Sequence, residues 1–392
     1  MRRFTSVSDV PVDRLFQSPA VDIGTLSPEQ IGAWAECASS AVLSNPYFEP
    51  ACQLPAVQYL DGAQGAQLVV AEQHGVLIAC LPIHTIVGRR GPFQLKVGHA
   101  RKVSTPVGLG SPFVCAPAVD HAADSLLTAL RNWSREGGPG IVVLDWLDDD
   151  VGGVGRTLRA ACVSRGIPLL VRRTWERPVV RRTADGLSLL STISKERRKE
   201  LNRRRRRLSE ALGGSVQLVD RAQDPSAVDD FLRLEASGWK GRDGDAIALR
   251  PDTTQWFRSV CENFASLGRL HMLSLEAAGQ TVAMQCCLRS GRDVFLFRVG
   301  HAAEFNAYGP GVLVIVEAVE FLSSFDIDLV DSGASPGNEF LSGLFPERRR
   351  LSTIIIGTGG TINRTAVRGL SVLAAGQTAL ARKRVPEALS PK

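Results

Sequence analysis

The stretch that decides the fold runs from residue 270 to residue 299 and reads LHMLSLEAAGQTVAMQCCLRSGRDVFLFRV. It contains three apolar runs with β-strand composition, at 270–276, 281–288 and 294–299. Two short turns, Ala-Ala-Gly-Gln and Ser-Gly-Arg, separate the runs and favour hairpins, because glycine tolerates a positive φ. The pattern predicts three antiparallel strands in series, within an α/β (α+β) fold whose sheet is mixed but largely antiparallel.

A glycine-rich turn follows the third strand. The sequence Tyr308-Gly-Pro-Gly-Val312 precedes an apolar segment that predicts a helix to about residue 324. Glycine lets the backbone approach an anion, proline at the first helical position lacks an amide that would be unpaired anyway, and the remaining N–H groups lie in the positive field of the helix dipole. The alternative is a plain turn at a helix start. The turn is the predicted diphosphate site, and the predicted cofactor-binding residues are Val299, Gly300, Gly309, Gly311 and Val312.

A carboxylate lies on the apolar face of the helix predicted at 225–238. Val228, Phe231, Leu232 and Glu235 follow the spacing i, i+3, i+4, i+7, so Glu235 shares the stripe that faces the core. A carboxylate in that position needs either a partner or a function. Two interpretations stay open: Glu235 pairs with an arginine or with backbone amides, or it binds a substrate amine and accepts its proton.

Further site candidates follow strand ends. The segment DSGASPGNE, residues 331–339, comes after the strand predicted at 328–331, and residues just beyond strand ends commonly line ligand crevices. Asp331 and Glu339 are therefore candidates, with a solvated turn as the alternative. His301 is the one histidine kept as a candidate, because the six histidines show neither metal-ligand spacing nor a G-x-S-x-G partner. We predict no metal site.

One segment carries the positive charge of the chain. Residues 195–207 hold nine lysines and arginines against Glu196 and Glu200, a local charge of +7, so the rest of a chain with net charge +6 carries about −1. The segment predicts a helix that ends at Gly213. The run from Arg203 to Arg207 suits an anionic ligand such as CoA, a nucleotide sugar, tRNA or anionic lipid, and the alternative is a solvated face. Few aromatic residues accompany it, so specific nucleic-acid recognition is not expected.

The N-terminal half repeats this order of elements. A helix is predicted from Ser27, with Gln30 completing a capping box. A hairpin turning at 73–75, a basic Gly/Pro-rich loop at 88–117, a helix at 121–136, a strand at 141–145, another helix and a strand at 167–173 follow. The second half adds a helix at 252–267, with Gln255 in a second capping box. We infer a duplication.

The lengths agree with this duplication, because domains usually hold about 100–200 residues. We place the two halves at 1–178 and 179–358. The remaining segment, 359–392, is predicted to be a helical tail docked on the body, with its helix at 361–383.

Composition places the chain among folded proteins. Its 392 residues are 44% hydrophobic and 22% charged, which excludes disordered, coiled-coil and collagen-like classes. The first thirty residues lack the apolar region of a signal peptide, and no stretch reaches the ~18 apolar residues of a membrane span. We expect a cytoplasmic protein that at most makes peripheral contact with the inner face of the membrane. The eight scattered cysteines are expected to be reduced core residues.

Together these motifs resemble a known family. The similar segments are KERRK at 195–199, Glu235-Ala-Ser-Gly-Trp239-Lys240-Gly241, the Gly-Pro-Gly turn, and residues 331–339. They resemble the BioF2-like (CelD-type) acetyltransferases of the GNAT superfamily, relatives of the FemAB transferases, over about residues 180–350. The resemblance implies tandem GNAT-like domains, of which the first is degenerate. It implies acyl transfer, other than aminoacyl transfer, from acetyl-CoA or another acyl-CoA to an amine or hydroxyl of a cell-envelope or polysaccharide precursor.

The resemblance also implies residue roles. The acceptor attacks the thioester directly, and main-chain amides of residues 297–300 polarise the carbonyl. Glu235 or Asp331 would take the proton, and Tyr308 would protonate the leaving thiolate. Lys240, with the arginine run, would neutralise phosphates. The residues expected to contact substrate are Trp239, Lys240, His301 and Glu339.

One departure from the family pattern leaves alternatives open. Family members carry a Tyr-Lys pair shortly after the Gly-x-Glu motif, where this chain reads Phe340-Leu341-Ser342. One alternative is a FemX-like transferase that uses aminoacyl-tRNA, with the arginine run as an RNA clamp. The other is a non-catalytic GNAT-fold adaptor.

Overall fold

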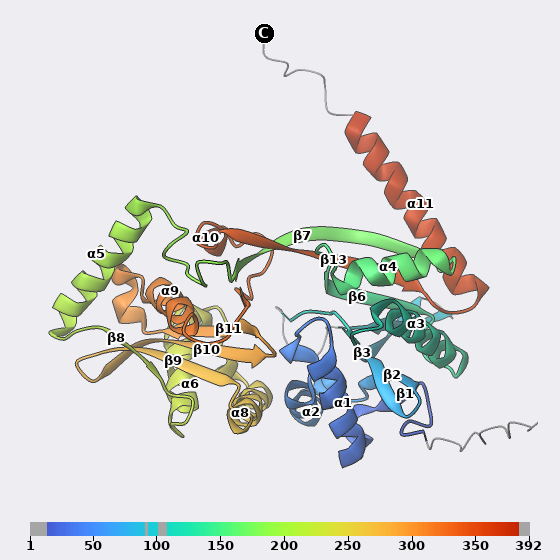
Figure 1. Cartoon of the computed structure of the whole chain (residues 1–392), viewed down its shortest axis with the longest axis horizontal. Coiled ribbons are helices and arrows are strands. Elements are labelled where there is room, and N and C mark those ends of the chain that lie inside the picture. The colour runs from blue at the N-terminus through green and yellow to red at the C-terminus, as the bar shows by residue number, and fades with distance from the viewer. Residues whose placement is uncertain (1–13, 91–92, 101–107, 384–392) are drawn as a thin grey trace, which may run out of the picture.

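The computed structural model describes residues 14–90, 93–100 and 108–383. In the N-terminal half, helices precede a series of antiparallel strands, and two helix–strand pairs follow them (Figure 1). Ser27 Oγ and Gln30 Oε1 each accept the backbone N–H of the other residue, which confirms the predicted capping box. The elements are β1 Ala20–Asp22, α1 Pro28–Ser40, α2 Pro50–Tyr59, β2 Gln67–Gln73, β3 Val76–Arg90, β4 Phe93–His99, β5 Phe113–Val114, α3 Val119–Arg135, β6 Ile141–Asp148, α4 Val154–Ser164 and β7 Leu169–Arg181.

The C-terminal half begins with the basic helix. Ser194 caps its N-terminus and Gly213, in the left-handed conformation, ends it as predicted. The elements are α5 Lys195–Leu212, β8 Gln217–Asp220, α6 Ala227–Ser237, α7 Trp239–Arg242, α8 Pro251–Ser266, β9 Leu270–Ala277, β10 Gln280–Ser290, β11 Asp293–His301, α9 Pro310–Leu322, β12 Leu329–Asp331, α10 Glu339–Ser342, β13 Glu347–Gly357 and α11 Thr361–Lys383. Short 3₁₀ turns are η1 Ile23–Thr25, η2 Pro46–Phe48, η3 Asp61–Ala63, η4 Ile247–Leu249 and η5 Ala303–Tyr308.

Two local predictions were wrong. The stretch 88–117, expected to be a loop, contains the end of β3 together with β4 and β5, because glycines, prolines and arginines hide the strand alternation. The capping box with Gln255 does not form, because α8 starts at Pro251 with Arg250 as its N-cap. Asp252 Oδ1 instead accepts the backbone N–H of Thr253.

The corrected elements make the two halves more alike than the sequence indicated. In the N-terminal half β4 pairs antiparallel with β3 and parallel with β6. In the C-terminal half β11 pairs antiparallel with β10 and parallel with β12. The mixed, largely antiparallel sheet predicted from the sequence is therefore present in both halves.

The strands of the two halves form one continuous sheet, in which the halves exchange their last long strands. The strand order is β1-β2-β3-β4-β6-β13-β7-β12-β11-β10-β9-β8. Strand β13 of the second half therefore lies beside β6 of the first, and β7 of the first half lies beside β12 of the second. Figure 1 shows β7 and β13 as a long ribbon that connects the halves. The predicted boundary after residue 178 falls inside β7.

Tertiary packing joins the halves along a second line, between α2 and α8. Asn263 Nδ2 donates to the Ala51 carbonyl at 3.1 Å, and Arg269 lies 2.6 Å from Glu49. Tyr47 packs edge-on against Phe295 of β11, with ring centroids 5.6 Å apart. All eight cysteines are buried and free, as the sequence predicted.

The tail helix is docked at its start. The predicted helix at 361–383 is α11, whose N-terminal turns lie along β7 while its far end projects from the body (Figure 1). Val367 is fully buried, and Arg364 Nη2 donates to the Gly166 carbonyl at 2.8 Å. Ser371 Oγ donates to the Leu169 carbonyl at 3.1 Å.

Four buried charges lie where the exchanged strands β7 and β13 pair. Arg177 of β7 is paired in register with Arg349 of β13. Both guanidinium groups reach Asp331, at 3.3 and 3.0 Å, and Arg349 Nε also donates to Asp148 at 2.5 Å. Burial opposes ionisation of Arg349, but Asp148 and Asp331 outweigh it and hold its pKa above the ordinary value. Two positive and two negative charges therefore balance inside the protein.

Replacing Arg349 by methionine should lower the free energy of unfolding by about 3–5 kcal/mol, because it leaves buried carboxylates without their counter-charge. The measurement is urea unfolding followed by circular dichroism. Arg350→Met is the matched control: its side chain is 52% exposed and 3.6 Å from Asp149, so a loss of about 1 kcal/mol or less is expected. Equal losses in the two variants would contradict a structural role for the cluster.

Candidate functional site

The site is built around an opening between β11 and β12. These strands pair only from Asp293 with Leu329 to Phe295 with Asp331. Gly333, at φ +63°, then turns the chain away, and a Cβ at this position would lie 2.5 Å from the Leu296 carbonyl oxygen. Within the described part of the chain, the rest of β11 pairs only with β10. Apart from the Val299 carbonyl, which accepts from Lys240 Nζ, its other edge is therefore available to hydrogen-bond an extended ligand chain.

The glycine-rich turn lies at the far end of β11. Gly309 adopts the left-handed conformation, Pro310 occupies the first position of α9, and the N–H groups of Val312 and Leu313 both donate to the Gly309 carbonyl. Fewer first-turn amides are thus free than the sequence suggested. A Cβ at Gly311 would lie 3.3 Å from His301 Nδ1, which shows how closely this turn approaches β11.

The basic helix α5 lies against this turn. A Cβ at Gly309 would come within 2.6 Å of Arg204 Nη1, and the Arg207 guanidinium lies 5.7 Å from the centre of the Tyr308 ring. These two arginines point positive charge at the start of α9. The family resemblance implied that the arginine run neutralises phosphates, but no local pattern in the sequence links residues 204 and 309.

Most of the predicted basic face of α5 is neutralised by neighbouring carboxylates. Arg203 and Arg204 pair with Glu200, at 2.7 and 2.8 Å. Arg205 pairs with Glu317 of α9, and Arg206 lies 3.5 Å from Glu210. The free positive field is therefore smaller than a count of arginines suggests, and an anionic ligand on this run stays a prediction.

Glu235 has the partners of a structural carboxylate. Its side chain is buried, Lys240 Nζ donates to Oε1 at 3.0 Å, and the N–H of Ile247 donates to Oε2 at 2.9 Å. Arg298 Nε lies 3.4 Å away. The geometry is that of the first interpretation offered by the sequence, in which Glu235 pairs with a cation and a backbone amide. A role as proton acceptor stays a prediction.

Lys240 ties this group to the opening. Its Nζ also donates to the Val299 carbonyl of β11 at 2.7 Å. Burial lowers the pKa of Lys240, while Glu235 opposes the shift. Gly300 allows α6 to approach β11, because a Cβ there would lie 3.0 Å from the Glu235 nitrogen. The described side chains do not include that of Trp239, so its predicted place in the acceptor pocket lies outside them.

The remaining predicted residues lie apart from this group. Asp331, at the root of the opening, is buried, and its carboxylate also accepts the N–H of Gly333. Glu339 is the exposed first residue of α10. His301 Nε2 lies 2.9 Å from Asn306 Oδ1, and burial lowers its pKa, opposed by this hydrogen bond and helped by Lys240. His301 is therefore close to the turn, whereas Asp331 is in the charged cluster.

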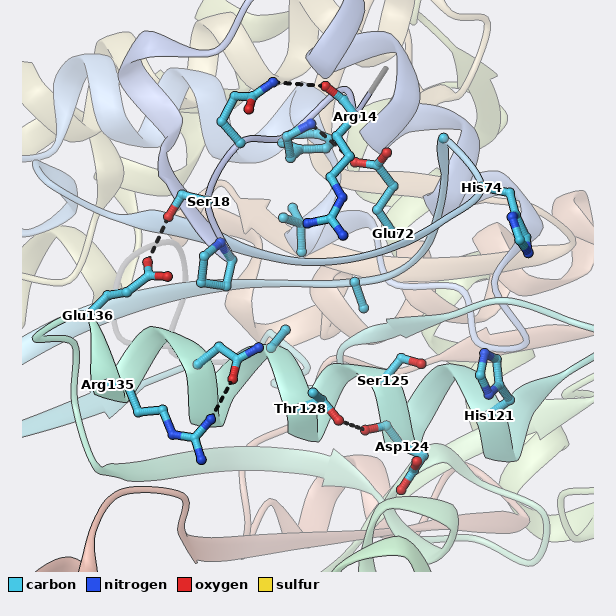
Figure 2. A pocket seen from close by; sticks show the side chains of 18 of the residues that line it. Arg14, Ser18, Glu72, His74, His121, Asp124, Ser125, Thr128, Arg135 and Glu136 are labelled. Carbon is cyan, nitrogen blue, oxygen red and sulfur yellow. Dashed lines mark hydrogen bonds between the residues drawn. The ribbon is translucent and has the colours of Figure 1, made fainter. Parts of the chain in front are cut away.

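A separate polar pocket of about 850 Å³ lies in the N-terminal half, between the β2–β3 hairpin and α3 (Figure 2). Its charged groups are largely bonded to each other or to backbone. Glu72 accepts from the N–H groups of Leu15 and Phe16, Glu136 accepts from Ser18, and Arg165 pairs with Asp124. Such internal pairing leaves little for a ligand to bind.

Two further findings concern the described residues alone. None of their His, Cys, Asp and Glu side chains form a group of three or more that could hold a metal ion. No helix among them is long and apolar enough to cross a membrane.

Comparisons with known proteins concern a segment of the C-terminal half and the fold of most of the chain. A family model described as an acetyltransferase (GNAT) domain matches residues 195–340. No curated protein sequence matches the chain significantly. The structure of FemX matches with a TM-score of 0.57 and 10% identity, covering 83% of this chain and 95% of that one.

Two other solved structures are similar over most of their length. The C-terminal domain of a protein described as a lysylphosphatidylglycerol synthetase, from Agrobacterium fabrum, has a TM-score of 0.51 and 12% identity, covering 88% and 96% of the two chains. A conserved protein of unknown function from Bacteroides thetaiotaomicron has a TM-score of 0.52 and 12% identity, covering 87% and 99%. At these identities the likeness shows the fold.

If Glu235 and Lys240 form a structural pair, their substitutions should be strongly coupled. Glu235→Gln and Lys240→Met should each destabilise the protein, and the double variant should be more stable than the sum of the single effects, with a coupling of about 1–3 kcal/mol. Thermal unfolding of the four proteins measures it. The exposed Arg206–Glu210 pair is the control, with an expected coupling below about 0.5 kcal/mol. Equal coupling in the two pairs would disprove the structural assignment.

Proposed function

Since residues 195–340 belong to the family of GNAT acetyltransferase domains, in a chain of FemAB-like GNAT fold, we propose that the protein transfers acyl groups from acyl-CoA to an amine or hydroxyl. The observation that carries this proposal is the opening between β11 and β12, next to the Gly309–Gly311 turn and Arg204. A cell-envelope or polysaccharide precursor remains the proposed acceptor.

The donor would lie along the free edge of β11. An extended pantetheine arm has amide groups that can pair with an unpaired strand edge, as a peptide strand does. The phosphates would lie at the start of α9, where the helix dipole, the Gly311 amide, Arg204 and His301 favour negative charge. Val299 and Gly300 would border the thioester, and Val312 the diphosphate.

The proposed chemistry is direct attack. The acceptor nitrogen or oxygen bonds to the thioester carbonyl carbon, the C–S bond breaks, and CoA leaves as a thiolate. Among residues 297–300, the main-chain N–H groups that do not face β10 would stabilise the oxyanion. Tyr308, half-buried below Arg207, is the proposed proton donor to the thiolate.

The acceptor also loses a proton. Both carboxylates named from the sequence have other partners: Glu235 binds Lys240 and Ile247, and Asp331 binds two arginines. We therefore propose that water in the opening takes this proton. Glu235 and Lys240 would act by holding the main chain of β11 at Val299.

A second candidate is transfer from aminoacyl-tRNA. The fold shared with FemX and the position of α5 beside the turn favour it. The pairing of Arg203, Arg205 and Arg206 with carboxylates weighs against an extended RNA contact. Direct binding measurements separate the two candidates.

Acetyl-CoA, a longer acyl-CoA or free CoA should raise the melting temperature of the protein. At 100 times Kd the expected rise is about 3 °C. Gly311→Leu should abolish the rise, because a side chain there fills the space between α9 and His301. Gly32→Leu is the matched control: it adds the same side chain at an exposed position of α1 with open space around it and should keep the response. No rise with any CoA species, together with a rise with charged tRNA, would replace the proposal by the second candidate. If neither a CoA species nor charged tRNA raises the melting temperature, the remaining alternative is a non-catalytic GNAT-fold adaptor.

His301 should make CoA binding depend on pH. Because its pKa is lowered, the imidazole is neutral at pH 7 and gains a positive charge as pH falls through a value below 6.5. A positive His301 attracts phosphate, so the ratio of CoA affinities between the native protein and His301→Gln should grow about threefold to tenfold from pH 7.5 to pH 5.5. Calorimetry at both pH values measures this ratio, and the titration of CoA itself cancels in it. A constant ratio would place His301 away from the phosphates.

A further inference from the structure

A pocket of about 460 Å³ lies between the two halves, beside the opening. Its floor comes from the exchanged strand ribbon and β6, and one wall comes from the loop after β12. It is separate from the paired polar pocket of Figure 2. The lining residues are Asp145, Trp146, Arg172, Arg173, Trp175, Pro336 and Thr353.

Two tryptophans form a rigid aromatic surface in this pocket. The Trp146 and Trp175 rings meet edge to face, with centroids 5.4 Å apart. The buried guanidinium of Arg177 lies 4.6 Å from the centre of the Trp146 ring. Trp146 has φ +58°, in a bulge where Asp145 and Trp146 oppose Thr353 alone. A bulky residue keeps such a strained conformation only where its surroundings enforce it, and these positions cluster at ligand sites.

The pocket also carries positive charge. Arg172 and Arg173 line it and are both exposed, and among the described residues neither forms an ion pair with an aspartate or glutamate. This is unlike α5, where carboxylates bind most arginines. The Arg173 guanidinium lies 5.7 Å from the centre of the Trp175 ring. One carboxylate, that of Asp145, also lines the pocket, but it already binds His99 and Thr353. The pocket thus offers two cations beside two aromatic rings.

The pocket lies close to the proposed point of transfer. Arg177 connects them, since it contacts Trp146 on one side and Asp331, at the root of the opening, on the other. The loop after β12 also links the pocket to the opening. Gly333 lies against the Leu296 carbonyl of β11, and Pro336 lines the pocket three residues later. Three residues of chain span at most about 11 Å.

We infer that this pocket binds the acceptor, and that the acceptor is a ring, sugar or nucleobase, that carries a phosphate or carboxylate. Both kinds of ring stack on tryptophan, and arginine binds both anions with paired hydrogen bonds. The role of this ligand as acceptor rests on the proposed function. The prediction that the pocket binds such a ligand does not depend on that function.

Calorimetry on the full chain tests the inference with three ring anions: glucose 1-phosphate, glucuronate and UMP. Glucose tests the ring alone and inorganic phosphate the anion alone. We expect at least one ring anion to bind, at least tenfold more tightly than either control. The comparison of the three shows which ring and which anion the pocket prefers.

Two substitutions locate the binding. Arg173→Gln and Trp175→Leu should each weaken it at least tenfold, while Arg131→Gln, an exposed arginine on α3, should leave it unchanged. Circular dichroism confirms that each variant is folded. The inference is overturned if no ring anion binds, if phosphate alone binds as well, or if the two variants bind normally.

The two proposals fail in different ways. Loss of ring-anion binding with an intact CoA response overturns the pocket and leaves acyl transfer in place. Ring-anion binding without any CoA response keeps the pocket and overturns the donor.

Discussion

The buried contact between Arg177, Arg349, Asp148 and Asp331 is the constraint on which the rest of the structure depends. Each charge would be costly inside the protein without the others, so the four fix the register in which β7 and β13 pair. A one-residue shift between these strands would turn the arginines to the opposite face. The same cluster holds the root of the β11–β12 opening through Asp331 and supports Trp146 through Arg177. One electrostatic arrangement thus positions both the β11–β12 opening and the pocket beside it.

The likeness of the two halves makes their difference informative. In the N-terminal half, the place equivalent to the β11–β12 opening lies between β4 and β6, which pair only up to His99 and Val143. There the chain fills its own gap. Gly110 lies so close to β6 that a Cβ would be 1.9 Å from the Asp145 carbonyl oxygen, and Ser111 Oγ accepts the N–H of Asp148. Within the described residues, only the second half leaves a strand edge open at this place, and the GNAT domain model matches that half, at residues 195–340.

Local sequence patterns predicted the C-terminal sheet well, since strands such as 270–277 are continuous apolar runs bounded by glycine turns. They missed β4, where glycine and proline interrupt the alternation, and they gave no sign of the strand exchange. Exchange depends on which strand edges meet across more than a hundred residues, and periodicity carries no such information. The site was predicted in part. Gly309 and Gly311 lie where a turn before a helix was expected, whereas the partners of Glu235 and Asp331, namely Lys240, Arg298, Arg177 and Arg349, became visible only in three dimensions.

The exchanged ribbon also affects how the chain is made. Strands β6 and β7 enclose the place of β13, so they cannot complete their hydrogen bonds until residues 347–357 have left the ribosome. At about 5–20 residues per second, the wait after β7 is on the order of ten seconds or more. During this time the first half exposes two unpaired strand edges, together with Arg177, which is buried in the folded protein. The two halves therefore cannot complete their folding one after the other, and a nascent chain that stalls between them exposes unpaired strand edges to chaperones and to other nascent chains.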